Sequence, residues 1–224
     1  MTSLTSPKSD PVKEIVKRLK ACSHNKDTWH VFCDFVELGA LTISNHVDLI
    51  QAAEREDKYL ELINEYPEDE RQLMCEMLAW VVIGLSTEPQ DVLGKVFHEL
   101  ELHNKWKGQY FTPLHLCRAI GRVTLEGIDE VIKDKGYITV NEPSCGSGGM
   151  LIGLALAMAD LGYNYQTQVL VDANDLDAKC THMCYIQLSL LGIPAVVKQQ
   201  DTLSQETFAT WYTPGYLMTQ RRAR

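Results

Sequence analysis

The chain has 224 residues, of which 45% are hydrophobic and 23% charged, and these proportions are ordinary for a globular protein. No apolar run reaches the roughly 18–20 residues that a membrane span needs, so we expect no membrane contact. The net charge of −9 does not favour binding to duplex DNA, which depends largely on Lys and Arg. It does not exclude DNA either, because basic residues gather locally in 105–107 and 221–224. The alternative for each basic cluster is a solvated surface.

Cysteine usage and the N-terminus indicate the compartment. Seven cysteines are scattered without a framework spacing, and residues 1–10 lack the apolar core of a secretory signal. The pattern predicts reduced thiols and a cytoplasmic location. Cys180 and Cys184 share one helix face, but His182 points elsewhere and a fourth ligand is not evident. We therefore predict no metal site.

The first hundred residues have helical periodicity. Residues 1–10 are rich in Ser, Thr and Pro and are predicted to be disordered. A helix is expected from Pro11, where Val12, Ile15 and Leu19 fall on one face and Asp10 is the cap. Further helices are predicted over 27–38, 46–66, 67–85 and 89–102. The predicted domains are a helical one over 11–107 and a second over 108–224.

The pattern changes after Gly108. A helix over 113–124 and a polar link lead to strands over 136–141, 168–173 and 195–198. Helices over 149–161 and 177–191 separate these strands. Strands that alternate with helices of this length indicate βαβ units and a parallel sheet. The predicted fold class is α/β, a helical region followed by a Rossmann-like core.

A glycine-rich turn follows the first predicted strand. Residues 141–149 read Asn-Glu-Pro-Ser-Cys-Gly-Ser-Gly-Gly. Glycines let the backbone approach a ligand closely, and the helix start beyond them offers free N–H groups. The spacing differs from the dinucleotide fingerprint and lacks the Gly-Lys-Ser/Thr ending of a triphosphate loop. Glu142 would repel phosphate, so it favours a ligand with a cationic group, such as the amino acid end of S-adenosylmethionine. A turn without a ligand is the alternative.

Acidic residues follow the next two strands. Asp175 is placed to accept hydrogen bonds from ribose hydroxyls, with Asp172 as second choice, whereas Asp177 resembles a helix cap. The alternative is that all three aspartates only cap the helix that follows. Asp201 could accept the exocyclic amine of an adenine, with Leu203 packed on the ring.

The segment before the helix at 113 reads Gly-Gln-Tyr-Phe-Thr-Pro over 108–113. Its aromatic pair and threonine could fold over a cofactor, and core packing is the alternative. The order of Gly-Gln-Tyr-Phe-Thr-Pro, Glu-Pro-Ser-Cys-Gly-Ser-Gly-Gly, Asn-Asp-Leu-Asp and Asp-Thr-Leu resembles the adenine-specific N6 DNA methyltransferases, above all the modification subunits of type I restriction systems. The resemblance covers roughly 90–203 and includes the segment that starts at Asp91.

This resemblance implies a cofactor, a reaction and a set of binding residues. The cofactor is S-adenosylmethionine and the reaction is methyl transfer to N6 of adenine in DNA. The implied binding residues are Tyr110, Phe111, Thr112, Glu142, Ser144, Gly146, Gly148, Asp175, Asp201 and Thr202.

The acceptor motif of the family is missing. That motif, Asn/Asp/Ser-Pro-Pro-Tyr/Phe, holds the target amine and stacks on the flipped base. The nearest candidate catalytic residues are Thr213, Pro214 and Tyr216. A threonine lacks the carbonyl or carboxylate that receives the proton of the amine, and losing one positioned polar group costs about 10²–10³ in rate. We therefore expect weak catalysis or none.

The predicted core is shortened, with only three parallel strands. The first strand is left with an unpaired edge. We hypothesise that the N-terminal helices, the C-terminal tail or a second chain, in a homodimer or with a partner subunit, covers this edge. Three functions stay open: a DNA adenine methyltransferase, a methyltransferase-like binding module without catalysis, and a methyltransferase acting on a small molecule or protein.

Overall fold

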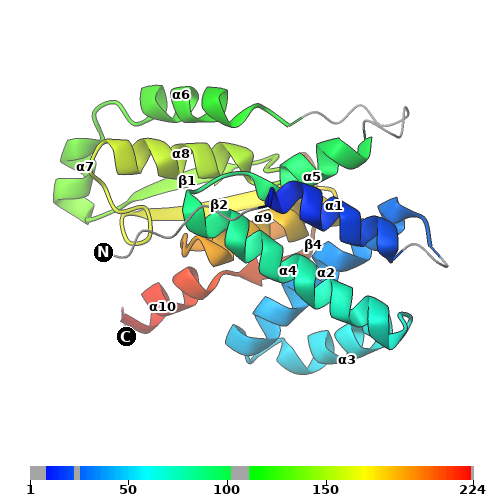
Figure 1. Ribbon diagram of the computed structural model, residues 1–224. Coiled ribbons are helices and arrows are strands. Elements are labelled where there is room, and N and C mark those ends of the chain that lie inside the picture. Colours follow the sequence, from blue (N-terminus) through cyan, green and yellow to red (C-terminus); the bar gives the residue numbers. More distant parts are fainter. Residues whose placement is uncertain (1–8, 23–25, 102–110, 223–224) are drawn as a thin grey trace.

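The structure is a computed structural model that describes residues 9–22, 26–101 and 111–222. Seven of the described helices precede the first strand, and the rest of the chain combines strands with helices (Figure 1). In chain order the elements are α1 (Pro11–Ala21), α2 (Thr28–Val47), α3 (Ala52–Ile63), α4 (Glu68–Thr87), α5 (Val92–Glu101), α6 (Leu114–Thr124), α7 (Ile128–Lys135), β1 (Ile138–Glu142), α8 (Gly149–Asp160), β2 (Val169–Asp175), α9 (Ala178–Leu190), β3 (Ala195–Gln200), β4 (Thr207–Tyr212) and α10 (Pro214–Arg222).

Aspartate side chains start several of these helices. Asp10 accepts a hydrogen bond from the backbone N–H of Val12 at 3.0 Å, and Asp177 accepts one from Lys179 at 3.1 Å. Such bonds satisfy N–H groups that have no partner inside the helix. Both predicted caps are therefore confirmed. The predicted disordered segment 1–10 lies outside the described residues as far as residue 8, whereas Asp10 is ordered as the cap of α1.

The second helix is longer than the sequence predicts. The break expected after Leu38 is wrong, since α2 runs through Gly39 to Val47 and α3 begins only at Ala52. A Cβ on Gly39 would lie 3.0 Å from Cδ1 of Ile186, so glycine lets α2 approach α9 closely. Tertiary packing thus offsets the roughly 1 kcal/mol by which glycine weakens a helix.

The sheet has the order β1-β2-β3-β4. The first three strands are parallel, as predicted, with Val140 opposite Val171 and Val171 opposite Ala195. The prediction of only three strands is wrong, because β4 pairs antiparallel with β3 and has Trp211 opposite Val197. Helices α7 and α10 were not predicted either. None of the described helices is long and apolar enough to span a lipid bilayer.

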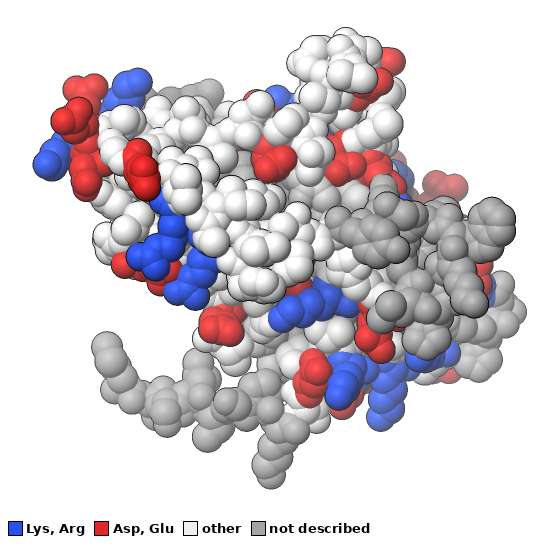
Figure 2. All heavy atoms as spheres, turned by 90° about the horizontal axis from the view of Figure 1, so that it is seen from above, with Lys and Arg blue, Asp and Glu red and all other residues white. Residues whose placement is uncertain are grey.

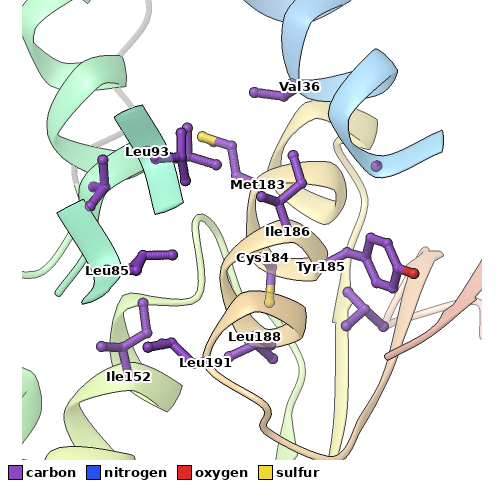
Figure 3. Packing of buried hydrophobic residues seen from close by; sticks show 14 of the residues in the cluster. Val36, Leu85, Leu93, Ile152, Met183, Cys184, Tyr185, Ile186, Leu188 and Leu191 are labelled. Carbon is purple, nitrogen blue, oxygen red and sulfur yellow. The ribbon is translucent and has the colours of Figure 1, made fainter. Parts of the chain in front are cut away.

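One face of the sheet is covered by helices. Connections between parallel strands are right-handed in nearly all proteins, and both connections here step in the same direction along the sheet, which places α8 and α9 on the same face. Helices α1 to α5 lie beyond α9, and α6 lies beyond α8 (Figure 1). Helix α9 is buried over most of its length, and Met183, Ile186 and Leu188 contribute to one apolar core with α5 and α8 (Figure 3).

The other face of the sheet is largely open. A groove there is lined by Thr139, Leu170, Val196 and Tyr216, together with neighbouring residues.

Among the described residues no strand pairs with the outer edge of β1. The N-terminal helices pack against α9 and α10 packs against β3, so neither accounts for this edge. Cover by a second chain stays a hypothesis.

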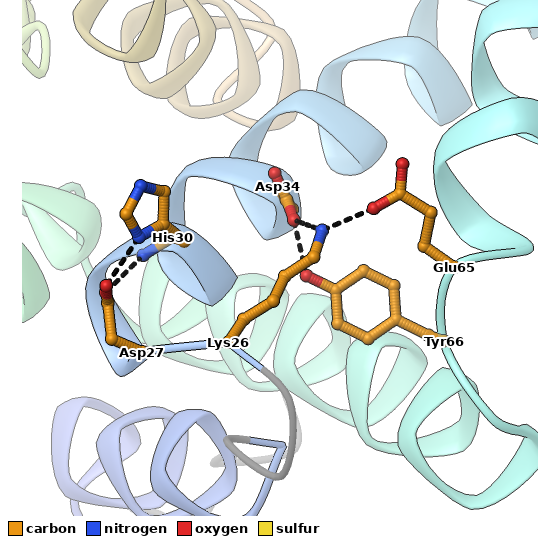
Figure 4. Close-up of polar contacts among 6 residues, drawn as sticks. All are labelled: Lys26, Asp27, His30, Asp34, Glu65 and Tyr66. Atoms are coloured by element: carbon orange, nitrogen blue, oxygen red, sulfur yellow. Dashed lines mark hydrogen bonds and ion pairs between the residues drawn. The ribbon is translucent and has the colours of Figure 1, made fainter.

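Polar contacts fix the corner between the N-terminal helices. The ammonium of Lys26 lies 2.5 Å from a carboxylate oxygen of Asp34 and 2.6 Å from one of Glu65 (Figure 4). Tyr66 donates its hydroxyl proton to Asp34, and burial together with this carboxylate raises the pKa of Tyr66. Close to this group, the ring of His30 is hydrogen-bonded to the carboxylate of Asp27, which caps α2. These contacts join the start of α2 to the end of α3.

A second polar contact links the N-terminal helices to β4. Arg55 is only 7% exposed and donates to the carbonyl oxygen of Thr210 at 2.7 Å. Its guanidinium carbon lies 3.9 Å from the ring centre of Trp211. Asp48 supplies the opposite charge at 3.6 Å. The helical region and the sheet are therefore held together by a buried cation as well as by apolar packing.

Candidate cofactor-binding site

Three carboxylates lie at the carboxyl ends of the three parallel strands. Glu142 ends β1, Asp175 ends β2, and Asp201 directly follows β3. Because parallel strands end at one edge of the sheet, these residues share that edge with the glycine turn over 145–149. This is the arrangement that the sequence predicts for a ligand with a cation, a ribose and an amine.

The glycine turn is held by the neighbouring strand. Cys145 donates its backbone N–H to the carbonyl oxygen of Asn174 at 2.9 Å, and Gly146 donates to Asp175 at 2.9 Å. Gly146 and Gly148 have φ angles of 54° and 92°, which glycine adopts most readily. A Cβ on Gly148 would lie 3.2 Å from the sulfur of Cys184. Both glycines are therefore required by the shape of the turn.

Glu142 is half-buried, and within the described part of the chain its carboxylate accepts one long hydrogen bond, from the N–H of Ser144 at 3.3 Å. Burial raises the pKa of Glu142, and the charge of Asp175 adds to the effect. A cationic ligand beside this carboxylate would supply an opposite charge and favour its ionised form. Glu142 therefore fits the amino acid end of S-adenosylmethionine. Ser144 itself is exposed beside it.

Asp175 and Asp201 are oriented by backbone N–H groups. Asp175 accepts from Gly146 and from Asp177, one bond to each oxygen. Asp201 accepts from Leu203 at 2.8 Å, and this bond lowers the pKa of Asp201. Asp172, the second choice, lies on the open face, where it pairs with Lys198 at 2.8 Å. It does not join the other carboxylates.

Polar side chains join the ends of the three strands. Asn174 donates to the carbonyl oxygen of Pro143 at 3.3 Å and to the hydroxyl of Thr202 at 2.8 Å. Thr202 in turn donates to Pro143 at 2.7 Å. Thr202 therefore lies at the predicted edge, but its hydroxyl is already bonded within the protein. Asn174 was not predicted, since its role depends on two residues distant in sequence.

The segment before α6 lies against the glycine turn. A Cβ on Gly146 would be 2.8 Å from Cε1 of Phe111, so the ring covers this glycine. Phe111 also packs on Phe97 at 4.8 Å between ring centres, and its N–H donates to His98 at 3.1 Å. Thr112 is exposed next to it. The predicted residue Tyr110 lies outside the described part of the chain.

The catalytic prediction for Thr213, Pro214 and Tyr216 is not supported by the structure. Because β4 runs antiparallel to β3, these residues come to the opposite edge of the sheet from the glycine turn. Thr213 is fully buried, accepts from the N–H of Ala195 and donates to Ile193, both at 2.8 Å. Tyr216 stacks on Tyr212 at 5.4 Å between ring centres. Thr213 is therefore a structural residue at the start of α10.

Charges on the described surface are mixed in sign. On the face that carries α6, Lys and Arg lie among Asp and Glu, and much of the described surface there is uncharged (Figure 2). Arg118 lies 2.5 Å and Arg122 3.9 Å from Asp160, which neutralises part of their charge. The basic cluster at 105–107 lies outside the described residues, and no group of metal-ligating side chains occurs within them.

Comparison with known proteins defines the family. The profile of the family described as N-6 DNA Methylase matches residues 89–220, which is more than half of the chain. The chain belongs to this family. Membership implies S-adenosylmethionine as the cofactor. The match begins just before α5, so that helix is included with the sheet. No curated protein sequence matches the chain significantly.

Two solved structures are similar in part. One is the type I restriction-modification system methyltransferase subunit from Streptococcus thermophilus, at 18% identity and a TM-score of 0.46, covering 87% of this chain and 40% of that one. The other is a candidate class I S-adenosylmethionine-dependent methyltransferase from Listeria monocytogenes, at 13% identity and a TM-score of 0.44, covering 94% of this chain and 68% of that one. The matched part of the chain thus covers less than half of the Streptococcus subunit.

Proposed function

We propose that this chain binds S-adenosylmethionine at the strand-end carboxylates and serves as the cofactor-binding part of a DNA adenine-N6 methyltransferase. The supporting observation is the set of three carboxylates, Glu142, Asp175 and Asp201, around one glycine turn. A phosphate cofactor would be repelled by this set, whereas a ligand with a cationic end is attracted.

Each carboxylate has a role in this proposal. Glu142 binds the ammonium of the cofactor, Asp175 accepts from the ribose hydroxyls, and Asp201 accepts from the adenine amine. Phe111 and Thr112 close the site from the side of α6. When bound, the cofactor supplies an electrophilic methyl group.

A second candidate is a methyltransferase-like binding module that does not transfer the methyl group. It is favoured by the position of Thr213, which is buried at the opposite edge of the sheet from the glycine turn. The two candidates share the cofactor site. They are distinguished by the transfer of tritiated methyl groups to unmethylated DNA. The first candidate requires more tritium in the DNA with the unmodified protein than with the double variant Gly146→Ala/Gly148→Ala.

The cofactor claim is tested by calorimetry on Glu142→Gln. A hydrogen bond to a charged group contributes about 1.5–3 kcal/mol, so we expect affinity for S-adenosylmethionine to fall tenfold or more. The matched control is Asp172→Asn, which removes a carboxylate from β2 on the open face and should leave affinity unchanged. Absence of binding by the unmodified protein, or equal loss in both variants, would contradict the proposal.

The raised pKa of Glu142 adds a pH dependence. A carboxylate attracts the cationic cofactor only when ionised, so affinity should weaken as pH falls through the raised pKa of Glu142. The Glu142→Gln variant should lack this part of the dependence. Calorimetric titrations from neutral to mildly acidic pH measure both.

A further inference from the structure

A buried carboxylate lies directly behind the glycine turn. Asp91, just before α5, is only 6% exposed. One of its oxygens accepts from the N–H of Gly94 at 2.8 Å and from the side-chain amide of Gln187 at 2.9 Å. The other accepts from the hydroxyl of Ser147 at 2.7 Å. The carboxylate thus joins α5, α9 and the turn.

Gln187 completes the cluster. Its side chain is fully buried, and its amide nitrogen also donates to the backbone carbonyl of Ser147 at 2.8 Å. Its oxygen accepts from the N–H groups of Val92 and Leu93 at 2.8 and 3.2 Å. Ser147 is therefore held at both its hydroxyl and its carbonyl. The peptide plane between Ser147 and Gly148 cannot rotate without breaking the bond from Gln187, and the Ser147 side chain cannot turn away without breaking the bond to Asp91.

Two glycines leave room for the carboxylate. A Cβ on Gly94 would lie 2.1 Å from an oxygen of Asp91, and one on Gly149 would lie 3.2 Å from the same oxygen. Gly94 belongs to the first turn of α5, and Gly149 is the first residue of α8. The N-terminal ends of helices favour negative charge. Space, hydrogen bonds and helix ends all favour a charged group at this position.

We propose that Asp91 is a positioning residue that fixes the glycine turn in its cofactor-binding conformation, acting through Ser147. The inference rests on the proposed function, since it concerns the same site. Gly146 and Gly148 flank Ser147, and unconstrained glycines sample many backbone conformations. Fixing the turn before binding removes an ordering cost that the cofactor would otherwise meet. The N-terminal helices thereby contribute to a site that they do not line.

The test compares variants of Asp91 and Ser147. Asp91→Ala and Ser147→Ala should each weaken S-adenosylmethionine binding about tenfold in calorimetry, which corresponds to about 1.4 kcal/mol. The double variant should be little weaker than either single one, because both remove the same contact. Asp91→Asn should bind nearly as the unmodified protein, because the Ser147 hydroxyl can rotate to accept from the new amide.

The control for a role in stability alone is Asp27→Ala. Asp27 caps α2 by accepting from the N–H of His30, three residues on, as Asp91 does from Gly94. Its loss should lower the urea midpoint of unfolding and leave affinity for the cofactor unchanged. Hydrogen exchange of the 145–149 amides, measured without cofactor, should accelerate in Asp91→Ala and Ser147→Ala but not in Asp27→Ala.

The outcomes separate the two proposals. If the unmodified protein binds the cofactor and Asp91→Ala binds equally well, the positioning role is overturned and the proposed function stands. If the unmodified protein does not bind, the proposed function fails. Unchanged exchange of the turn amides in Ser147→Ala would overturn the positioning role whether or not the cofactor binds.

Discussion

The contact between α6 and α8 provides a sharp test of the packing. A Cβ on Gly153 of α8 would lie 2.5 Å from Cβ of Cys117, 2.6 Å from its carbonyl carbon and 2.8 Å from the backbone nitrogen of Arg118. Since two of these atoms belong to the backbone of α6, they cannot move without shifting the helix. Gly153→Ala should therefore push α6 away from α8.

The magnitude follows from two opposing terms. Overpacking costs about 1–3 kcal/mol, and contact with backbone places Gly153→Ala near the upper limit. Replacing a helical glycine by alanine stabilises the helix by about 1 kcal/mol, because alanine has the higher helix propensity. We expect a net loss of about 2 kcal/mol. Gly39→Ala is the matched control, because its Cβ would approach side-chain atoms and no backbone, the nearest being the terminal methyl of Ile186 at 3.0 Å. It should be neutral or slightly stabilising.

Urea unfolding followed by far-UV circular dichroism measures the difference between the two variants. Because both exchange a helical glycine for alanine, the changes in helix propensity and in the unfolded chain are common to them. The two variants should therefore differ in free energy of unfolding by about 2–3 kcal/mol, which reflects the packing at each site. Equal midpoints for the two variants, with unchanged slopes, would refute the close α6–α8 contact.

Two other buried groups give further predictions. Burial lowers the pKa of His182 to about 4, and Arg55, Lys58, Glu37 and Asp177 are the charged groups that act on it. The unfolded chain, with a histidine pKa near 6.5, takes up the proton first. Stability should therefore fall as pH drops from about 6.5 to 4, by up to about 3 kcal/mol. The His182→Gln variant should lose less free energy of unfolding between pH 7 and pH 5 than the unmodified protein does. Equal losses in urea titrations of the two proteins would contradict this. Arg55→Met leaves the carboxylate of Asp48 buried without its partner, so we expect a loss of about 3 kcal/mol. Adding Asp48→Asn should recover part of this loss. A urea midpoint that stays unchanged in Arg55→Met would rule out a stabilising contact between Arg55 and β4.

Local signals in the sequence were sufficient for most of the elements. The caps at Asp10 and Asp177 were predictable because a capping bond joins residues two or three apart. The parallel strands were predictable from apolar runs separated by helices. The break in α2 at Gly39 was wrongly predicted, since the helix continues through a contact with α9 that no local pattern reveals. Strand β4 was missed although 207–212 contains β-branched and aromatic residues.

The chemistry of the site was encoded in the sequence, whereas the position of its parts was decided by the tertiary structure. Glu142, Asp175 and Asp201 follow strands, and parallel strands necessarily end at one edge of the sheet. Thr213 comes after a strand as well, but that strand reverses direction, which carries the residue to the opposite edge. Asp91 reaches the turn only because α5 packs beside α9. Strand direction and helix packing depend on contacts between distant residues, and these determine which side chains can act together.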